Sequence, residues 1–330
     1  MIDTVTLYVE GRKNAGFDIN EKEFKKKQNE QDKTNLLYNT FYEDKERRNK
    51  SIYICNNLDL NFALVDFSVP KLLYGNSLEN VRIEDTEKIE GILKNRLNGI
   101  FDTDFLNTKV SRLDITQNME MENDIPIYIH SLKEAYSGNK RYRVEKYSDE
   151  SLTIKNNSRR IVIYDKIKEA FDNKDITRQE AKAYSNILRY EIQHKKARNI
   201  KTSFNNKKQF VLTDVFTMEF FETAKLFQLK MFDEMFCNSG NYGLFMSDIA
   251  LMDIVTKYNK RGTLKNFVIK KLTDLYEHEH NFEHYEDLLK LSGMSRDGIR
   301  KAKRELRKLL LLSKGKMTDV IEEIRNKLVA

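Results

Sequence analysis

The sequence predicts an α+β fold, in which a mostly antiparallel sheet is followed by an all-helical part. Two helical stretches, at about 84–98 and 124–136, lie between short strand-like runs, and from about residue 213 onward the pattern is helical throughout. Mostly antiparallel strands mixed with helices imply an α+β sheet domain. We therefore expect two domains, 1–205 and 206–330. The predicted strands cover residues 3–9, 51–56, 61–67, 110–117, 140–146, 160–165 and 187–193.

The segments between these strands are assigned from their composition. Residues 14–34 are polar and are predicted to be a mobile insertion. The charged segment that begins at Lys166 is predicted to be helical, and the basic, Asn-rich stretch 195–208 predicts a linker or a DNA-contacting loop. Thr213 and Asp214 are candidates to cap the first C-terminal helix.

Tyr164 ends a short apolar run, Ile161-Val162-Ile163-Tyr164-Asp165-Lys166. If the run continues as a strand, Tyr164 and Lys166 point to the same face. A nearby ammonium or metal ion favours the phenolate, which makes a tyrosine a better nucleophile. The alternative interpretation is an ordinary strand aromatic, since tyrosine is common in strands. Tyr142 and Tyr147 lie upstream and are the alternatives if a second nucleophile exists, but we interpret them as structural or DNA-stacking residues.

Two further strands carry charge on one face. In 111–116, Arg112 and Asp114 alternate with apolar residues, and in 187–193 Arg189 and Glu191 do the same. Charged side chains are seldom buried unless they are paired or bind a metal. Two carboxylates on neighbouring strands suit Mg²⁺ or Mn²⁺. Cross-strand Arg–carboxylate salt bridges are the alternative interpretation.

Taken in order, Ser111-Arg112-Leu113-Asp114, Ile163-Tyr164-Asp165-Lys166 and Leu188-Arg189-Tyr190-Glu191 resemble the motifs of a known family. The family is the rolling-circle replication initiators of filamentous phages, the gene II/gene X replication proteins. Transferase-like plasmid initiators are more distant relatives. The resemblance covers roughly residues 1 to 205, where Met1-Ile2-Asp3 and the segment 70–76 also fit the family.

The resemblance implies a Rep-type endonuclease and strand transferase. Tyr164 matches the family's nucleophile and Lys166 its companion lysine, while Asp114 and Glu191 match the acidic positions around a metal ion. Arg112 and Arg189 match basic positions that orient those carboxylates or contact phosphate. Many related nucleases carry a His-hydrophobic-His metal strand, whereas the corresponding segment here, 113–115, has no histidine. The full ligand set is therefore left open.

The implied reaction is nicking of one strand at a phage or plasmid origin. Attack by Tyr164 leaves a 5′-phosphotyrosine link and a 3′-hydroxyl that primes a polymerase. We expect origin DNA, single-stranded or in a hairpin, as the partner, together with a host helicase and polymerase. A mobilisation relaxase or a single-strand transposase would use the same chemistry. A DNA-binding regulator without activity is the alternative from another class.

The last part of the chain holds a helix-turn-helix candidate at 285–312. A helix at 285–292 ends at Gly293, and Ser295 is a candidate cap for a second helix that begins at Arg296. A recognition helix needs an apolar inner face and a basic or polar outer face. A plain basic amphipathic hairpin is the alternative. The basic side chains that we expect to contact DNA are Arg296, Arg300, Lys303 and Arg304.

Composition is consistent with a polyanionic partner. The 330-residue chain has a formal net charge of +7, and 33% of its residues are charged. Cys55 and Cys237 are too few for a disulfide framework or a zinc knuckle, and reduced thiols predict a cytoplasmic protein. No segment predicts a membrane span. His280 and His284 are spaced for a shared zinc, but we interpret their segment as solvated. The oligomeric state, monomer or dimer, is open.

Overall fold

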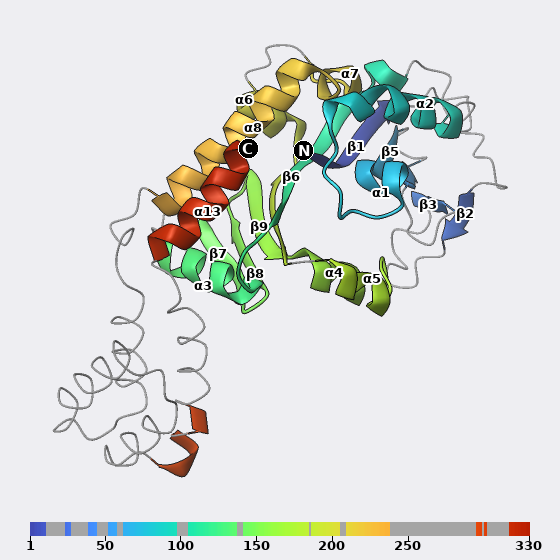
Figure 1. Ribbon diagram of the computed structural model, residues 1–330. Coiled ribbons are helices and arrows are strands. Elements are labelled where there is room, and N and C mark those ends of the chain that lie inside the picture. Colours follow the sequence, from blue (N-terminus) through green and yellow to red (C-terminus); the bar gives the residue numbers. More distant parts are fainter. Residues whose placement is uncertain are drawn as a thin grey trace. The chain divides into compact units, whose positions relative to one another are not determined.

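The computed structural model describes the sheet and the helices packed on it (Figure 1). The described residues are 1–10, 24–27, 39–44, 52–57, 62–97, 105–136, 141–184, 186–204, 209–237, 295–298, 300–301 and 317–330. Within them, ten strands form one sheet in the order β2-β3-β4-β5-β1-β6-β10-β9-β8-β7, and every paired neighbour is antiparallel. The strands are β1 (Ile2–Glu10), β2 (Phe24–Lys27), β3 (Asn39–Asp44), β4 (Ile52–Asn57), β5 (Phe62–Ser68), β6 (Lys109–Glu120), β7 (Arg143–Ser148), β8 (Ser151–Lys155), β9 (Arg159–Asp165) and β10 (Ile187–His194).

Helices connect these strands and follow the last of them. The described helices are α1 (Val69–Tyr74), α2 (Thr86–Leu97), α3 (Ile125–Ala135), α4 (Lys166–Asp172), α5 (Arg178–Ala183), α6 (Ala197–Ser203), α7 (Leu212–Val215), α8 (Met218–Phe232) and α13 (Met317–Val329). The α+β class and the antiparallel sheet are therefore confirmed, as are the helices predicted at 84–98, at 124–136 and after Tyr164. None of the described helices is long and apolar enough to cross a membrane.

All seven predicted strands are present, and three more were missed. β2 lies inside the stretch that was predicted to be a mobile insertion, so that prediction is wrong for Phe24–Lys27. β3 begins and ends with polar residues, which weakens the alternation on which the prediction relied. β8, Ser-Leu-Thr-Ile-Lys, does alternate, but it is only five residues long.

Two local predictions after β10 are also corrected. The stretch predicted as a linker or loop, 195–208, contains helix α6, whose Ile200 is fully buried and anchors one turn against the sheet. The first long C-terminal helix, α8, begins four residues later than the predicted cap. Its first turn is capped by Thr217, whose hydroxyl oxygen accepts a hydrogen bond from the Phe220 amide at 3.2 Å.

The core lies on the apolar face of the central strands. On β10 this face carries Leu188, Tyr190 and Ile192, which are all fully buried. Helix α8 covers them, because the Phe232 ring meets the Tyr190 ring edge-on with 5.9 Å between centroids. Figure 1 shows α6 and α8 on this side of the sheet. With one face filled by hydrocarbon, the alternate residues of the same strands form the opposite, polar face.

The chain divides into two compact units. The first comprises Met1–Ile125, Gly138–Phe232 and Asn326–Ala330 and holds the whole sheet, and the second comprises Pro126–Ser137 and Asp233–Arg325. In the second unit, Arg325 pairs with Asp233 at 2.8 Å, and the Tyr128 hydroxyl bonds to Glu323. The predicted domain boundary at 205/206 stays a prediction, but α7 and α8 belong to the sheet-containing unit.

Candidate functional site

The polar face of β6, β10 and β9 brings together the residues that the three motifs contribute. Antiparallel pairing sets Tyr164 opposite Arg189, and Arg189 opposite Asn118. Two residues further along β10, on the same face, Glu191 lies opposite Val162 of β9 and Thr116 of β6. Directly paired residues share a face of the sheet. The strand pairing therefore makes Tyr164, Arg189 and Asn118 neighbours on one face, although they lie far apart in the chain.

The Tyr164 hydroxyl lies between a carboxylate and a guanidinium. It donates a hydrogen bond to Glu191 Oε2 at 3.2 Å, and Arg189 Nη1 approaches the same oxygen of the tyrosine at 3.5 Å. Burial raises the pKa of Tyr164 well above its usual value of 10, Arg189 opposes that rise, and Glu191 adds to it. In this state the hydroxyl carries its proton at neutral pH. Its ionisation needs the proton to leave and a positive charge to compensate.

Arg189 is a fixed, buried positive charge beneath that hydroxyl. Its side chain is only 2% exposed, and it lies 3.4 Å from Asp3 Oδ1. Its Nε donates to Asn118 Oδ1 at 2.7 Å, and its Nη2 donates to the Ser77 carbonyl oxygen. Neighbouring acidic groups raise the pKa of Arg189 despite its burial, so the guanidinium stays charged. Several protein groups thus hold one cation in place.

Asp114 and Glu191 are the carboxylates of this face. Arg112 donates two hydrogen bonds to Asp114, at 3.2 and 2.5 Å, and also lies 3.9 Å from Asp66. Burial and the charge of Glu191 raise the pKa of Asp114 well above its usual range. The pKa of Glu191 is raised by burial and by Asp3. Like charges held together in a buried place favour a counter-ion or a proton.

Asp3 is a member of this site that motif reasoning did not single out. It is 9% exposed, and it pairs with Arg189 and raises the pKa values of both site carboxylates. The sequence signal was the weak family fit of Met1-Ile2-Asp3. A bulge in the pairing of β1 with β6, between Ile2 and Val5, accompanies its position.

Lys166 lies close to Tyr164, but not for the predicted reason. The strand ends at Asp165 and Lys166 opens helix α4, so the alternation rule for strands does not apply to it. Its ammonium lies 5.9 Å from the centroid of the Tyr164 ring and donates to Glu169 at 2.5 Å. The side chain is 2% exposed, and burial lowers the pKa of Lys166. The lysine is therefore beside the ring and paired, rather than in front of the hydroxyl.

A cation at this site would have few protein ligands. Among the described residues, no group of three or more His, Cys, Asp or Glu side chains has the arrangement of a metal site. Mg²⁺ is commonly held by one or two carboxylates with water and substrate phosphate oxygens completing its shell. The hard oxygen donors of Asp114 and Glu191, with their raised pKa values, fit that mode of binding.

The alternative tyrosines and the nearest histidine do not share this face. Tyr147 pairs with Leu152, whereas Tyr164 pairs with Ser151, so the two tyrosines lie on opposite faces. The Tyr142 hydroxyl instead lies 3.4 Å from Arg159. His194 lies on the apolar face, between the rings of two phenylalanines, which makes it a core residue.

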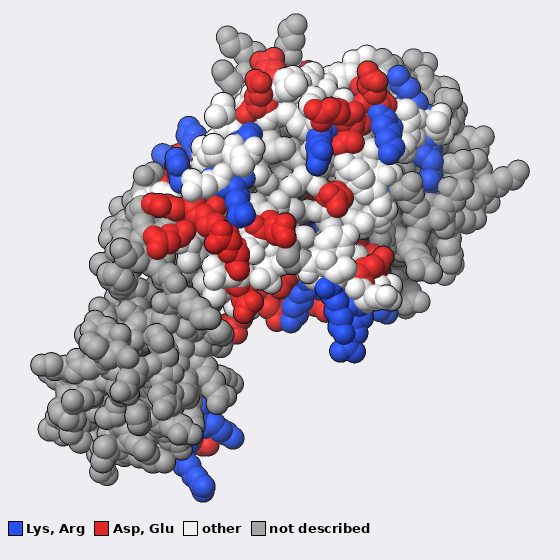
Figure 2. Space-filling view, in the orientation of Figure 1, with Lys and Arg blue, Asp and Glu red and all other residues white. Residues whose placement is uncertain are grey.

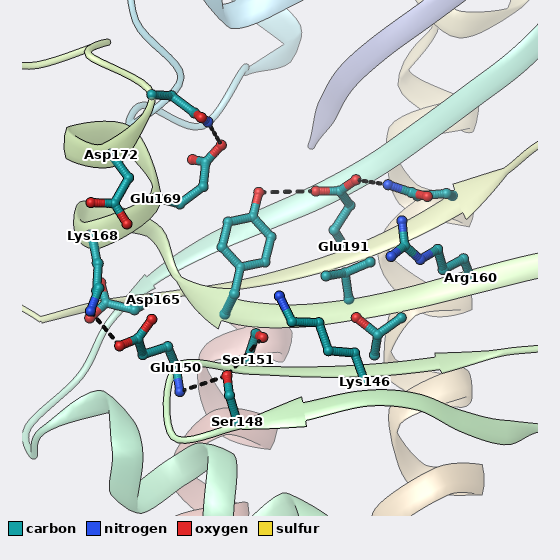
Figure 3. Close-up of a pocket in the computed structure, with 15 residues that line it drawn as sticks. Lys146, Ser148, Glu150, Ser151, Arg160, Asp165, Lys168, Glu169, Asp172 and Glu191 are labelled. Carbon is teal, nitrogen blue, oxygen red and sulfur yellow. Dashed lines mark hydrogen bonds and ion pairs between the residues drawn. The ribbon is translucent and has the colours of Figure 1, made fainter.

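A cavity of about 450 Å³ opens beside Tyr164 (Figure 3). Strands β7 to β10 and helix α4 line it, and Glu191 and Gln193 form one wall. In Figure 3, Glu191 points toward the tyrosine hydroxyl and accepts the hydrogen bond described above. A group bound in this cavity would therefore lie beside the Tyr164 side chain.

The predicted C-terminal contacts lie only partly within the described residues. Residues 296–298 and 300–301 are helical, and Ser295 caps this turn, since its hydroxyl oxygen accepts from the Gly298 amide at 3.2 Å. Arg296 is exposed, and Arg300 is 79% exposed and lies 3.3 Å from Asp297. Lys303 and Arg304 lie outside the described residues, as do His280, His284 and most of the helix-turn-helix candidate.

A family model for the N-terminal part of a phage replication-associated protein (Phage_CRI) matches residues 71–213. Over these residues the chain is similar to that family. The match confirms the predicted resemblance to the filamentous-phage gene II initiators and supports a phage replication initiator. The matched segment, 71–213, contains β6, β9 and β10, and hence Asp114, Tyr164, Arg189 and Glu191. No curated protein matches the chain.

Both signs of charge are present on the face drawn in Figure 2. Lys and Arg side chains and Asp and Glu side chains both lie over its described residues. The net charge of +7 alone therefore does not locate a DNA path there.

Proposed function

We propose that this protein is a replication initiator that nicks one strand of origin DNA, with Tyr164 as the nucleophile. The observation that carries the proposal is the position of the Tyr164 hydroxyl. The tyrosine lines an open cavity, and its hydroxyl donates to Glu191 and lies 3.5 Å from the buried Arg189, all within the segment that matches the phage initiator family. The family implies nicking activity in general, and these contacts of Tyr164 support it as the nucleophile.

The reaction follows from these contacts. The Tyr164 oxygen attacks phosphorus as its proton passes toward Glu191, to which the hydroxyl already donates. A bond forms between the phenolic oxygen and phosphorus, and the bond from phosphorus to the 3′-oxygen breaks. The 3′-oxygen takes up a proton from water and leaves as a hydroxyl that primes synthesis, while the 5′-phosphate stays on Tyr164.

Arg189 stabilises the charge that develops on the phenolic oxygen. Because its guanidinium is held by Asp3, Asn118 and the Ser77 carbonyl, it needs no reorganisation as the proton leaves. Arg112 keeps the Asp114 carboxylate in place. Asp114 and Glu191 would hold Mg²⁺ or Mn²⁺, and a bound cation polarises the scissile phosphate.

A covalent adduct tests this proposal. Labelled single strands that tile the replicon encoding the protein are incubated with it and Mn²⁺, and the products are separated on a denaturing gel. We expect an adduct that disappears in Tyr164→Phe while DNA binding stays nearly intact. Tyr147→Phe, on the opposite face of the sheet, is the matched control and should form the adduct.

Two outcomes would overturn parts of the proposal. An adduct in Tyr164→Phe would move the nucleophile elsewhere. Salt-sensitive DNA binding without an adduct on any strand would favour a non-catalytic regulator. An adduct on a strand other than the origin would indicate the relaxase or transposase alternative, which shares this chemistry.

Metal titration tests the cation separately. Asp114→Ala and Glu191→Ala should each weaken Mn²⁺ binding, measured calorimetrically in the presence of a single strand. Glu87→Ala, an exposed carboxylate at the start of α2, provides the control. Unchanged Mn²⁺ affinity in both site variants would remove these carboxylates as ligands.

A further inference from the structure

The cavity beside Tyr164 exists because the neighbouring polar-face residues are small. Ser151 lies directly opposite Tyr164, and Thr153 lies opposite Val162. The short side chains of β8 therefore leave space on the polar face next to the large Tyr164 ring. The α4 side forms a higher wall, with Asp165 and Asp172.

A bulge in the edge strand places a lysine on this face. Val144 pairs with Ile154, and Lys146 pairs with Thr153, so Glu145 is the extra residue between them. Without the bulge, Lys146 would pair with Leu152 and point to the apolar face. Lys146 instead shares a cross-strand row with Thr153, Val162 and Glu191.

Lys146 is available for an outside partner. Of the other cations that line the cavity, Arg160 pairs with Glu145 at 3.0 Å, and Lys168 pairs with Glu150. Lys146 makes no ion pair with any residue that the structure describes. Figure 3 shows its side chain extending into the cavity, with no contact drawn from its ammonium group.

We propose that this cavity binds the nucleotide next to the scissile phosphate on the cleaved strand, with Lys146 contacting its phosphate. The acidic residues on the α4 side repel a phosphate, and the Lys146 side attracts it. The hydroxyls of Ser148 and Ser151, 3.2 Å apart, offer donors and acceptors to a sugar or a base edge. The inference rests on the proposed function, because it takes Tyr164 as the attacking group.

The size of the cavity selects a single strand. About 450 Å³ lies within the usual range for one small ligand, so it accommodates a nucleotide rather than a base pair. Strands are spaced about 4.8 Å apart, which sets β7 about 10 Å from β9. A lysine side chain that extends inward across that gap reaches a phosphate adjacent to one at Tyr164.

Binding of a fluorescein-labelled oligothymidylate over a series of NaCl concentrations tests the contact. Loss of one phosphate contact on a single strand lowers the slope of log affinity against log salt by about 0.7. We expect this decrease in Lys146→Gln and not in Lys146→Arg. Lys94→Gln, which removes an exposed lysine paired with Glu90 on α2, is the matched control. Equal slopes in Lys146→Gln and Lys94→Gln would overturn the proposal.

Neutral phosphates locate the subsite. In the strand that gives the adduct, one phosphate at a time is replaced by methylphosphonate. We expect one of the two phosphates that flank the scissile one to be the partner of Lys146. Replacing that phosphate should weaken binding to the wild-type protein but cause little further loss of affinity in Lys146→Gln. Additive losses at both neighbours would overturn the assignment. A wild-type protein that neither binds nor nicks single strands would instead refute the proposed function.

Discussion

Acidification should unfold this protein partly through one buried imidazole. The His194 ring packs between Phe204 and Phe227, at centroid distances of 5.4 and 5.5 Å, and its Nε2 lies 2.9 Å from the Ser203 hydroxyl. Burial, helped by the nearby Arg159 cation, lowers the pKa of His194 from 6.5 to about 3. The unfolded chain therefore takes up a proton near pH 6.5 that the folded chain refuses until about pH 3.

The sign and size of the effect follow by linkage. The stabilisation from neutral His194 is complete above pH 6.5 and is lost as the pH falls toward 3. Relative to its value above pH 6.5, the free energy of unfolding falls by about 2 kcal/mol at pH 5. The full decrease, reached below pH 3, is about 5 kcal/mol. Asp114 and Glu191 act in the opposite sense, because their pKa values are raised on folding.

Comparison with His194→Gln isolates the imidazole. The variant keeps the carboxylates, so their contribution cancels when the two proteins are compared at each pH. Urea unfolding is followed by far-UV circular dichroism at pH 7, 6 and 5, since the chain has no tryptophan. The variant should be less stable at pH 7, and the difference should shrink by about 2 kcal/mol at pH 5. A difference that is constant with pH would refute the reasoning.

Other substitutions test the packing and the C-terminal helix. Arg189→Met should lower the free energy of unfolding by about 3–5 kcal/mol, because it leaves buried carboxylates unpaired. Adding Asp3→Asn to Arg189→Met should restore part of that loss. A double variant whose loss equals the sum of the two single losses would contradict the pairing. Thr217→Ala should cost about 1 kcal/mol by removing the cap of α8, which equilibrium unfolding measures directly. Arg296→Gln with Arg300→Gln should weaken origin binding in an anisotropy assay, and unchanged affinity would remove this helix from DNA recognition.

These arginine substitutions replace a simpler experiment, deletion of everything after about residue 210. Such a truncation would remove α8, whose Phe232 covers Tyr190. It would also remove Lys327 of α13, whose carbonyl oxygen accepts a hydrogen bond from the Gln117 side chain. It would expose the core of the sheet-containing unit. A loss of DNA binding would then report unfolding rather than recognition.

Periodicity was sufficient to predict the central strands and the face on which their charges lie. On β10, the alternation of Arg189 and Glu191 with apolar residues is the same in the structure as in the sequence. A strand buried on one side has only one workable register, so pattern and structure agree. Placing Asp114, Tyr164 and Glu191 together also required the family motifs, because strand order is not encoded in local alternation.

What was missed depends on irregular backbone or on distant partners. The change from strand to helix at Lys166 moves one side chain off the predicted face. The signal for that boundary was Asp165, which caps α4 by accepting a hydrogen bond from the Lys168 amide at 2.9 Å. The bulge at Glu145 likewise moves a side chain, that of Lys146, to the other face of the sheet. Asp3 became visible only through Arg189, which lies far away in the sequence.

The order in which the site's strands are synthesised has a consequence for when the protein becomes active. Asn118 and Arg189 are separated by 71 residues, and Tyr164 and Glu191 by 27. During translation, β6 emerges long before the strand that completes its polar face, and β9 waits for the same partner. A nascent chain therefore carries its tyrosine without the guanidinium and carboxylate beside it. On the proposed mechanism, newly made protein would become able to cut DNA only once β10 has joined the sheet.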